Sequence, residues 1–443
     1  MKNDNIAAIS TAAGAAGVAV IRISGDSPLS VAEKLFRPVG KTLVKDFIPN
    51  FMYAGEIDAG DFKDFGLCVY FKAPKSFTGE DTVEFHSHGG VAISRGILKK
   101  ILSSGARLAK NGEFTRRAFM NGKLSLASSE GLIDMINAES TAGVKAGYSL
   151  YRERLTKDVT EMQEGLTAAL SQIDADMDFP EEGLEETSRE AVSLALDAAI
   201  EKTDALLATF KTGSRVKNGV KVGIVGKPNV GKSSLLNALL GFDKAIVSGI
   251  AGTTRDVVEG SLDIGGVRFF LSDTAGIREA DGIEGFGVEL SKKALNENDI
   301  LLFLVAAGDI TAEDERVYSL CKDKNALFIV NKTDESDAKD GRADLYVSAK
   351  TGEGTEELKK LLYERAVGKI DLSGDFLCEE RHYEALTRAK ESLSSAKSGA
   401  ETEPLDVLAI DITAGWQALG EITGKTASED IIDDIFSRFC VGK

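Results

Sequence analysis

The chain has 443 residues, of which 43% are hydrophobic and 28% charged, and its formal net charge at pH 7 is −17. This length predicts about three domains, and the acidic balance argues against a general nucleic-acid-binding protein. No apolar run of about 18 residues is present, so we expect no transmembrane helix, and Met1–Asp4 lack a signal-peptide pattern. The cysteines lack the spacing of a zinc site, which predicts a reducing, cytoplasmic location. They are Cys68, Cys321, Cys378 and Cys440.

Residues 1–120 mix short β-like runs with glycines, which predicts an α+β domain. The expected strands are Gly17–Ile23, Leu67–Phe71 and Thr82–His86. The expected helix is Val91–Ser103, after Gly-Gly.

The rest of the chain predicts an inserted domain. Residues 121–216 and 372–443 share long helical periodicity, whereas residues 217–371 alternate strand-like and helix-like segments. We therefore expect an α/β domain inserted into one all-helical domain, with the two ends of the insertion close together. The predicted fold is thus multidomain, combining α+β, all-helical and α/β parts.

Residues 226–233 form a complete phosphate-binding P-loop, Gly-Lys-Pro-Asn-Val-Gly-Lys-Ser. The motif follows an expected strand, Val220–Val225, and opens an expected helix, Ser233–Leu240. The glycines let backbone N–H groups wrap phosphates, and the helix N-terminus adds partial positive charge. We expect Lys232 to reach the β- and γ-phosphates and Ser233 to bind Mg²⁺.

Two later motifs indicate that the base is guanine. Asn331–Asp334 (Asn-Lys-Thr-Asp) follows the apolar run Ala326–Val330, at the carboxyl end of an expected strand, where ligands bind in parallel α/β sheets. The Asp334 carboxylate can accept hydrogen bonds from guanine N1–H and the exocyclic amine, which adenine does not offer. Ser348–Lys350 (Ser-Ala-Lys) follows the short strand candidate Asp344–Val347, and a backbone amide there can meet the base oxygen.

Two segments between these motifs are typical of nucleotide switches. Asp273–Gly276 (Asp-Thr-Ala-Gly) follows the expected strand Val267–Leu271. We expect Asp273 to hold Mg²⁺ through water and Gly276 to sense the γ-phosphate. Thr254 is the expected second protein ligand to Mg²⁺. The order of the motifs resembles that of a Ras-like P-loop GTPase of the translation-factor-related group.

The residues expected to bind GTP come from all of these motifs. They are Asn229, Val230, Gly231, Lys232, Ser233, Ser234, Ser248, Gly249, Ile250, Ala251, Gly252, Thr253, Thr254, Asp273, Thr274, Ala275, Gly276, Asn331, Lys332, Asp334, Ser348, Ala349 and Lys350.

GTP hydrolysis in this chain needs a substitute for two groups that are common in GTPases, a water-orienting glutamine and an arginine finger. The position that often holds a water-orienting glutamine is Ile277, and no arginine finger is evident in the chain. A monovalent cation could supply the missing charge if Asn229 and the carbonyls of residues 248–253 cage it against the phosphates. The presence of Asn at position 229 is explained equally well by a turn, because Asn tolerates the backbone angles that turns require. Glu284 could orient the water, although the sequence alone favours a solvated loop carboxylate.

One basic stretch stands out in this acidic chain. It is explained either by a solvated helix face or by a surface for RNA phosphates or an anionic cofactor. Its cations are Arg95, Lys99, Lys100, Arg107, Lys110, Arg116, Arg117 and Lys123.

Four features occur together in this chain. They are the segments Phe77–Asp81 (Phe-Thr-Gly-Glu-Asp) and Phe114–Lys123, the inserted GTPase domain and the final Phe439–Lys443 (Phe-Cys-Val-Gly-Lys). In combination they resemble the MnmE (TrmE) family of tRNA modification GTPases. It runs from the first expected strand to the last residue.

The resemblance implies a K⁺-stimulated GTPase that works with a flavoprotein partner, MnmG (GidA), which carries FAD. The pair, a heterotetramer, adds an aminomethyl or carboxymethylaminomethyl group to carbon 5 of wobble uridine 34 in certain tRNAs. The N-terminal domain would hold 5-formyl- or methylene-tetrahydrofolate and form a homodimer, while GTP and K⁺ bring two GTPase domains together.

The resemblance also implies roles for particular residues. The folate contacts fall on Arg22, Glu84, Lys123 and Lys443. The K⁺ contacts fall on Asn229, Ser248, Ile250 and Thr253, and the Mg²⁺ contacts on Ser233 and Thr254. The catalytic residues expected are Glu284, which orients the water, with Asp273 and Lys232.

Some positions stay open or depart from the family. Cys440 is a candidate nucleophile at uracil carbon 6 or a docking residue in the tail. Thr11–Gly17 replaces a segment often rich in proline and glycine, and Gly285 stands where a larger residue is common. His86 and His88 are interpreted as structural.

Two other functions share the GTPase motifs. A ribosome-assembly GTPase would carry a basic RNA-binding module, which this chain does not clearly show. A membrane-remodelling GTPase would need a basic amphipathic helix or a lipid anchor, and Val441–Lys443 does not complete a prenylation motif. Folate binding separates the tRNA-modifying interpretation from both.

Overall fold

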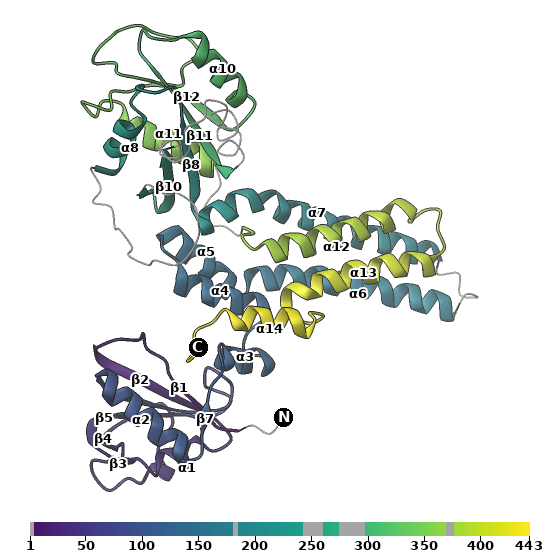
Figure 1. Cartoon of the computed structure of the whole chain (residues 1–443). Helices are drawn as coiled ribbons and strands as arrows, with labels where there is room; N and C mark the ends of the chain where they lie inside the picture. The colour runs from purple at the N-terminus through teal and green to yellow at the C-terminus, as the bar shows by residue number, and fades with distance from the viewer. Residues whose placement is uncertain (1–3, 180–184, 242–259, 274–296, 369–375) are drawn as a thin grey trace. The chain divides into compact units, whose positions relative to one another are not determined.

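The computed structural model describes residues 4–179, 185–241, 260–273, 297–368 and 376–443 (Figure 1). The chain packs as two compact units. Unit 1 contains residues 1–133, 150–174 and 412–443. Unit 2 contains residues 134–149 and 175–411. Within the described ranges, no helix combines the length and the apolar character needed to cross a membrane.

The N-terminal part of unit 1 is built on a mixed sheet of order β3-β4-β5-β6-β2-β1-β7. In β2, Ile21 and Ile23 are buried and alternate with half-buried Val20 and Arg22, as expected for a strand with one face on the core. The strands are β1 (Ile6–Ile9), β2 (Ala16–Gly25), β3 (Phe36–Pro38), β4 (Met52–Asp58), β5 (Lys63–Phe71), β6 (Asp81–Gly89) and β7 (Arg107–Leu108).

Helix α2 (Val91–Ser103) packs on this sheet, and Val31 and Ala32 of α1 (Pro28–Ala32) join the same buried cluster. Ile97 and Ile101 of α2 are four residues apart, so they lie on one side of the helix, and they pack with Ile21 and Phe85 in one buried cluster. The helices of this part are α1 (Pro28–Ala32), the 3₁₀ turn η1 (Val44–Asp46), α2 (Val91–Ser103) and α3 (Glu113–Met120). The expected α+β fold is confirmed, including the helix Val91–Ser103.

The end of the chain packs in the same unit. Ile435 and Phe436 of α14 (Glu429–Ser437) are buried together with Leu126. Beyond α14, Val441 forms a β-bridge with Asn111. The other long helices that contribute to unit 1 are α4 (Leu126–Asn137), α6 (Arg154–Asp178) and α13 (Leu405–Thr423), each of which continues into unit 2.

In unit 2, α7 and α12 form an antiparallel helix pair (Figure 1). Phe210 stacks on Tyr383 with 4.4 Å between ring centroids. Further along, Lys397 Nζ lies 2.7 Å from Asp197. The helices of unit 2 are α5 (Thr141–Tyr151, which ends in unit 1), α7 (Glu185–Asn218), α8 (Lys232–Gly241), α10 (Ala312–Cys321), α11 (Thr355–Val367) and α12 (Glu380–Gly399).

The inserted α/β domain has a sheet of order β13-β12-β11-β8-β10-β9. The strands pair in parallel except β9, which runs antiparallel to β10. Every residue of β11 is buried, as expected for a parallel strand covered on both faces. The strands are β8 (Val220–Val225), β9 (Gly260–Ile264), β10 (Val267–Asp273), β11 (Ile300–Ala306), β12 (Ala326–Asn331) and β13 (Leu345–Tyr346). The predicted multidomain fold is confirmed.

Candidate functional site

The P-loop connects β8 to α8 at the carboxyl edge of the parallel sheet. A Cβ on Gly226 would lie 2.3 Å from the carbonyl oxygen of Leu304, so the loop needs glycine there to approach β11. Asn229 (φ 67°) and Gly231 (φ 96°) adopt left-handed backbone conformations. This geometry accounts for the Asn at position 229, because Asn tolerates the left-handed region better than most residues.

Two lysines are fixed around this loop. Lys232 is buried, and its Nζ donates hydrogen bonds of 3.0 Å to the carbonyl oxygens of Gly226 and Lys227. Lys227 forms ion pairs of 3.0 Å with Asp309 and Asp314. The loop therefore curls around the ammonium of Lys232. Ser233 and Ser234 are exposed in the first turn of α8, where amide groups have no partner inside the helix.

The ends of neighbouring strands bring the other motifs to the P-loop. Asp273 ends β10, and its backbone is in register with Ile224 of β8. Asn331 ends β12 and is almost fully buried. Its Nδ2 donates to the carbonyl oxygen of Val230 at 2.9 Å, and its Oδ1 accepts from the amide of Ala349 at 3.0 Å. Asn331 therefore ties the P-loop to the Ser348–Lys350 loop.

Asp334 is oriented by the same loop. Ser348 Oγ donates to Asp334 Oδ1 at 2.7 Å, and Lys350 Nζ lies 3.5 Å from Asp334 Oδ2. The hydrogen bond from Ser348 is the main cause of a lowered pKa for Asp334. The carboxylate is therefore ionised at neutral pH and can accept N–H groups. Lys332 has a left-handed backbone (φ 64°).

Several predicted residues lie outside the described residues. They are Ser248, Gly249, Ile250, Ala251, Gly252, Thr253, Thr254, Thr274, Ala275, Gly276 and Glu284, together with Ile277 and Gly285.

In unit 1, Arg22 and Glu84 face each other on β2 and β6. Arg22 Nε donates to Glu84 Oε1 at 2.7 Å, and His86 Nε2 lies 3.5 Å from Glu84 Oε2. Burial works to raise the pKa of Glu84, but His86 and Arg22 outweigh it and the pKa is lowered. The Arg22 guanidinium carbon lies 5.3 Å from the ring centroid of Phe77 and 5.6 Å from that of Phe114. The pair is thus flanked by aromatic rings.

The other two predicted folate residues are held by backbone contacts. Lys123 Nζ donates to the carbonyl oxygen of Pro74 at 3.0 Å. The carbonyl oxygen of Lys443 accepts from the amide of Phe114 at 3.3 Å, which places the tail beside one of the rings that flank Arg22. Cys440 is exposed.

Comparisons with known proteins agree along the whole chain. A family model described as "GTP-binding protein TrmE N-terminus" matches residues 5–123, and one described as "MnmE helical domain" matches residues 126–440. The chain is 39% identical to the tRNA modification GTPase MnmE of Caldicellulosiruptor saccharolyticus, 40% to that of Desulforamulus reducens and 42% to that of Moorella thermoacetica. Each alignment covers 100% of both chains. The chain belongs to the MnmE family of tRNA modification GTPases. It is accordingly a GTP-hydrolysing enzyme of the tRNA modification class.

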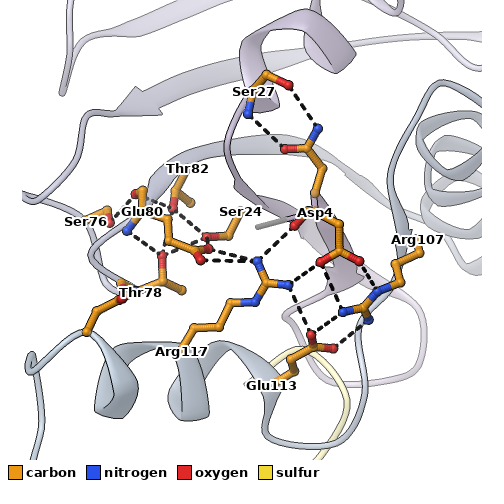
Figure 2. A network of polar contacts seen from close by, with 12 residues as sticks. Asp4, Ser24, Ser27, Ser76, Thr78, Glu80, Thr82, Arg107, Glu113 and Arg117 are labelled. Carbon is orange, nitrogen blue, oxygen red and sulfur yellow. Dashed lines mark hydrogen bonds and ion pairs between the residues drawn. The ribbon is translucent and has the colours of Figure 1, made fainter. Parts of the chain in front are cut away.

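In this MnmE-family chain, a polar network holds the Phe-Thr-Gly-Glu-Asp loop (Figure 2). Glu80 is buried, and its Oε2 accepts from Ser24 Oγ at 2.8 Å and from Arg117 Nη1 at 3.0 Å. Arg117 also binds Asp4 at 2.8 Å and Glu113 at 3.2 Å. The network thereby fixes the loop that carries Phe77 against β2 and α3.

This network changes the interpretation of the basic stretch. Arg107 pairs with Asp4 and Glu113, and its hydrogen bond is the main cause of the lowered pKa of Asp4. Arg116 pairs with Glu429 and Asp433 of α14. Arg107, Arg116 and Arg117 are therefore structural cations. Arg95 and Lys99, on the exposed side of α2, remain available to an anion.

Sequence reasoning missed the aromatic flanks of Arg22 in this MnmE-family chain. Phe77 and Phe114 each begin one of the segments that carry the family resemblance. The sequence alone does not predict that either ring contacts Arg22. The available signal was Arg22 itself, because guanidinium groups stack on aromatic faces.

His88 Nδ1 lies 2.6 Å from Asp64 Oδ1, and this contact joins β6 to β5.

Proposed function

We propose that this chain is the GTP-hydrolysing subunit of a complex that adds an aminomethyl or carboxymethylaminomethyl group to carbon 5 of wobble uridine 34 in certain tRNAs. A 5-formyl- or methylene-tetrahydrofolate supplies the carbon, and a flavoprotein partner of the MnmG (GidA) kind supplies FAD. The observation that carries the proposal is the full-length relationship to tRNA modification GTPases. The joined P-loop and guanine motifs support it.

The nucleotide is GTP with Mg²⁺. Asp334, ionised and oriented by Ser348, supports recognition of the two guanine donors. Ser233 is exposed at the start of α8, as a Mg²⁺ ligand must be. Thr254 is the second Mg²⁺ ligand, and Asp273 acts through water.

Hydrolysis depends on K⁺. Asn229, Ser248, Ile250 and Thr253 hold the cation against the phosphates, where its charge replaces an arginine finger. Glu284 orients the attacking water. Asn229 lies inside the P-loop and is exposed, so its side chain is accessible to a cation, which supports this assignment.

The folate site lies on the N-terminal sheet. Lys123 and Lys443 offer cations to the carboxylates of the folate tail, whereas Arg22 is paired with Glu84 and lies at the pterin end of the site. Glu84 offers a carboxylate to the pterin donors. The partly buried ring of Phe77 supports the assignment, because a planar pterin can stack beside an aromatic ring.

The protein works as a cytoplasmic homodimer that joins its flavoprotein partner in a heterotetramer and acts on tRNA. Large apolar side chains exposed on the N-terminal domain support a protein interface there. They include Val39, Ile48, Phe51, Met52 and Phe65.

Two measurements on the purified full-length protein test the proposal. GTP hydrolysis should be at least about tenfold faster in KCl than in NaCl, because Na⁺ does not fit a cage sized for K⁺. Calorimetry should detect binding of 5-formyl-tetrahydrofolate, and Glu84→Gln should abolish it with GTP turnover nearly unchanged. Equal rates in both salts would remove the cation cage. A protein that hydrolyses GTP but binds no folate would favour a ribosome-assembly GTPase instead.

A further inference from the structure

The β9–β10 hairpin occupies a special position in the GTPase domain. In sequence it lies between residues 242–259, which contain the first switch motif, and residues 274–296, which follow Asp273. The two strands pair antiparallel, and their turn is Gly265-Gly266, with φ values of 61° and 84°. Both segments are therefore covalently continuous with the hairpin: residues 242–259 lead into β9, and residues 274–296 follow β10.

The tip of this hairpin contacts the start of α5. The amide of Ala142 donates to the carbonyl oxygen of Gly266 at 2.9 Å. A Cβ on Gly266 would lie 3.3 Å from Thr141 Oγ1, and a Cβ on Gly265 would lie 2.7 Å from the ring of Tyr363 on α11. The tip therefore fits closely between the last helix of the GTPase domain and α5.

Arg268 extends the contact along the hairpin. Its Nη1 lies 3.2 Å from Glu139 Oε2, and its Nη2 donates to Ser261 Oγ of β9 at 3.0 Å. The guanidinium carbon lies 5.7 Å from the ring centroid of Phe270. One largely buried arginine thus joins both strands of the hairpin to the segment before α5.

The segment that receives these contacts, residues 134–149, has a particular place in the chain. It packs with unit 2, although its covalent neighbours on both sides, up to residue 133 and from residue 150, belong to unit 1. Ala142 and Ala146 are buried in the same cluster as Val267 and Phe269 of β10. The segment therefore packs in the core of the GTPase domain, while the chain on both sides of it belongs to unit 1.

The contact between hairpin and segment is not fully packed. A cavity of about 310 Å³ lies beside Arg268 and Glu139, so this polar side of the contact is less densely packed than the apolar side, where Val267 and Phe269 are fully buried. Its lining also includes Asp134, Asn137, Ser140, Lys217 and Phe270.

We propose that Arg268 is a positioning residue that couples the nucleotide state to the rest of the molecule. Through Arg268 and Gly266, the hairpin passes nucleotide-dependent shifts to residues 134–149, and these residues carry them into the N-terminal unit. The inference rests on the proposed function for its purpose, which is to link GTP hydrolysis to tRNA chemistry. The proposed route follows the contacts that join the hairpin to residues 134–149, namely Arg268 with Glu139 and Gly266 with Ala142.

Hydrogen exchange on the full-length protein tests this coupling without any tRNA. In the wild type, the exchange rate of residues 134–149 should differ by about threefold or more between the GDP-bound and the GTP-analogue-bound protein. Arg268→Gln should remove that difference. Its kcat and KM for GTP should stay within about twofold of the wild type. A charge exchange, Arg268→Glu with Glu139→Arg, should restore the difference.

Arg342→Gln is the matched control, because Arg342 pairs with Glu315 inside the GTPase domain. It should leave the nucleotide-dependent exchange intact. The proposal is overturned if residues 134–149 of the wild type exchange equally in both nucleotide states, or if Arg268→Gln keeps the difference. A fall of GTP affinity and exchange together would also overturn it, because Arg268 would then only support the fold.

The yield of modified tRNA per GTP hydrolysed, measured with the flavoprotein partner, distinguishes a failure of the coupling through Arg268 from a failure of the proposed function. If the wild type modifies tRNA, Arg268→Gln should lower that yield about fivefold or more. If the wild type shows the exchange difference but modifies no tRNA, the coupling stands and the proposed function fails.

Discussion

At the scale of single residues, Asp334 is the side chain that we propose recognises the base. Its side chain is held by Ser348 at 2.7 Å, and that hydrogen bond lowers its pKa. Asn331 adds rigidity, because it binds both the P-loop and the Ser348–Lys350 loop. A carboxylate fixed in this way accepts two N–H groups from guanine with little loss of freedom.

Asp334→Asn should therefore change the base preference. An amide offers one acceptor oxygen and one donor NH₂ group. It can therefore still accept from N1–H, but it mismatches the exocyclic amine of guanine and matches the carbonyl that xanthine has in its place. Affinity for GTP should fall about 100-fold, since a hydrogen bond to a charged group contributes about 1.5–3 kcal/mol. Competition between GTP and XTP for a fluorescent nucleotide measures the change.

Asp337→Asn is the control, because Asp337 is exposed in the same loop. It should leave the preference for GTP unchanged. Unaltered GTP affinity in Asp334→Asn would show that another group reads the base.

At the scale of elements, three helical segments meet at Lys217, near the end of α7 and just before the first strand of the GTPase domain. Its Nζ lies 2.7 Å from Asp134 of α4 and contacts Glu379, just before α12. Burial works to lower the pKa of Lys217, but the two carboxylates raise it. Burial, and then Glu379, raise the pKa of Asp134. One partly buried ammonium therefore holds together both ends of the insertion and α4.

Lys217→Met should destabilise unit 2 by about 2–3 kcal/mol, because it leaves two carboxyl groups buried together without their cation. The estimate is at the low end for a buried pair, since 24% of the Lys217 side chain is exposed. Chemical denaturation at pH 7 measures it. A loss below about 0.5 kcal/mol would show that the ion pairs are no stronger than surface ones.

Asp134→Asn separates charge from shape in this cluster. Since the pKa of Asp134 is raised on folding, the folded state holds a proton that the unfolded state has released. The free energy of unfolding should therefore fall as pH rises from about 4 through the raised pKa. In Asp134→Asn this part of the pH dependence should disappear. A pH profile identical to that of the wild type would contradict the assignment.

At the scale of the whole molecule, local motifs predicted the fold, and they predicted that the nucleotide motifs meet at one edge of a parallel sheet. The P-loop, Asn331 and Asp334 each follow a buried strand, and parallel strands bring such ends to one edge. Contacts distant in sequence could not be predicted. The local sequence predicts that Arg116 is a surface cation, but in the structure it pairs with Glu429 and Asp433 of α14. Likewise, the contact of Arg268 with Glu139 depends on how α5 packs, which no local pattern records.

The measurement that tests the central claim most directly is nucleoside mass spectrometry on tRNA from a cell in which this gene is deleted. The account predicts that the C5 modification of wobble uridine disappears and returns when the gene is restored. It also predicts no return with an Asp334→Asn copy. Wobble uridines that keep their modification in the deleted cell would contradict the account.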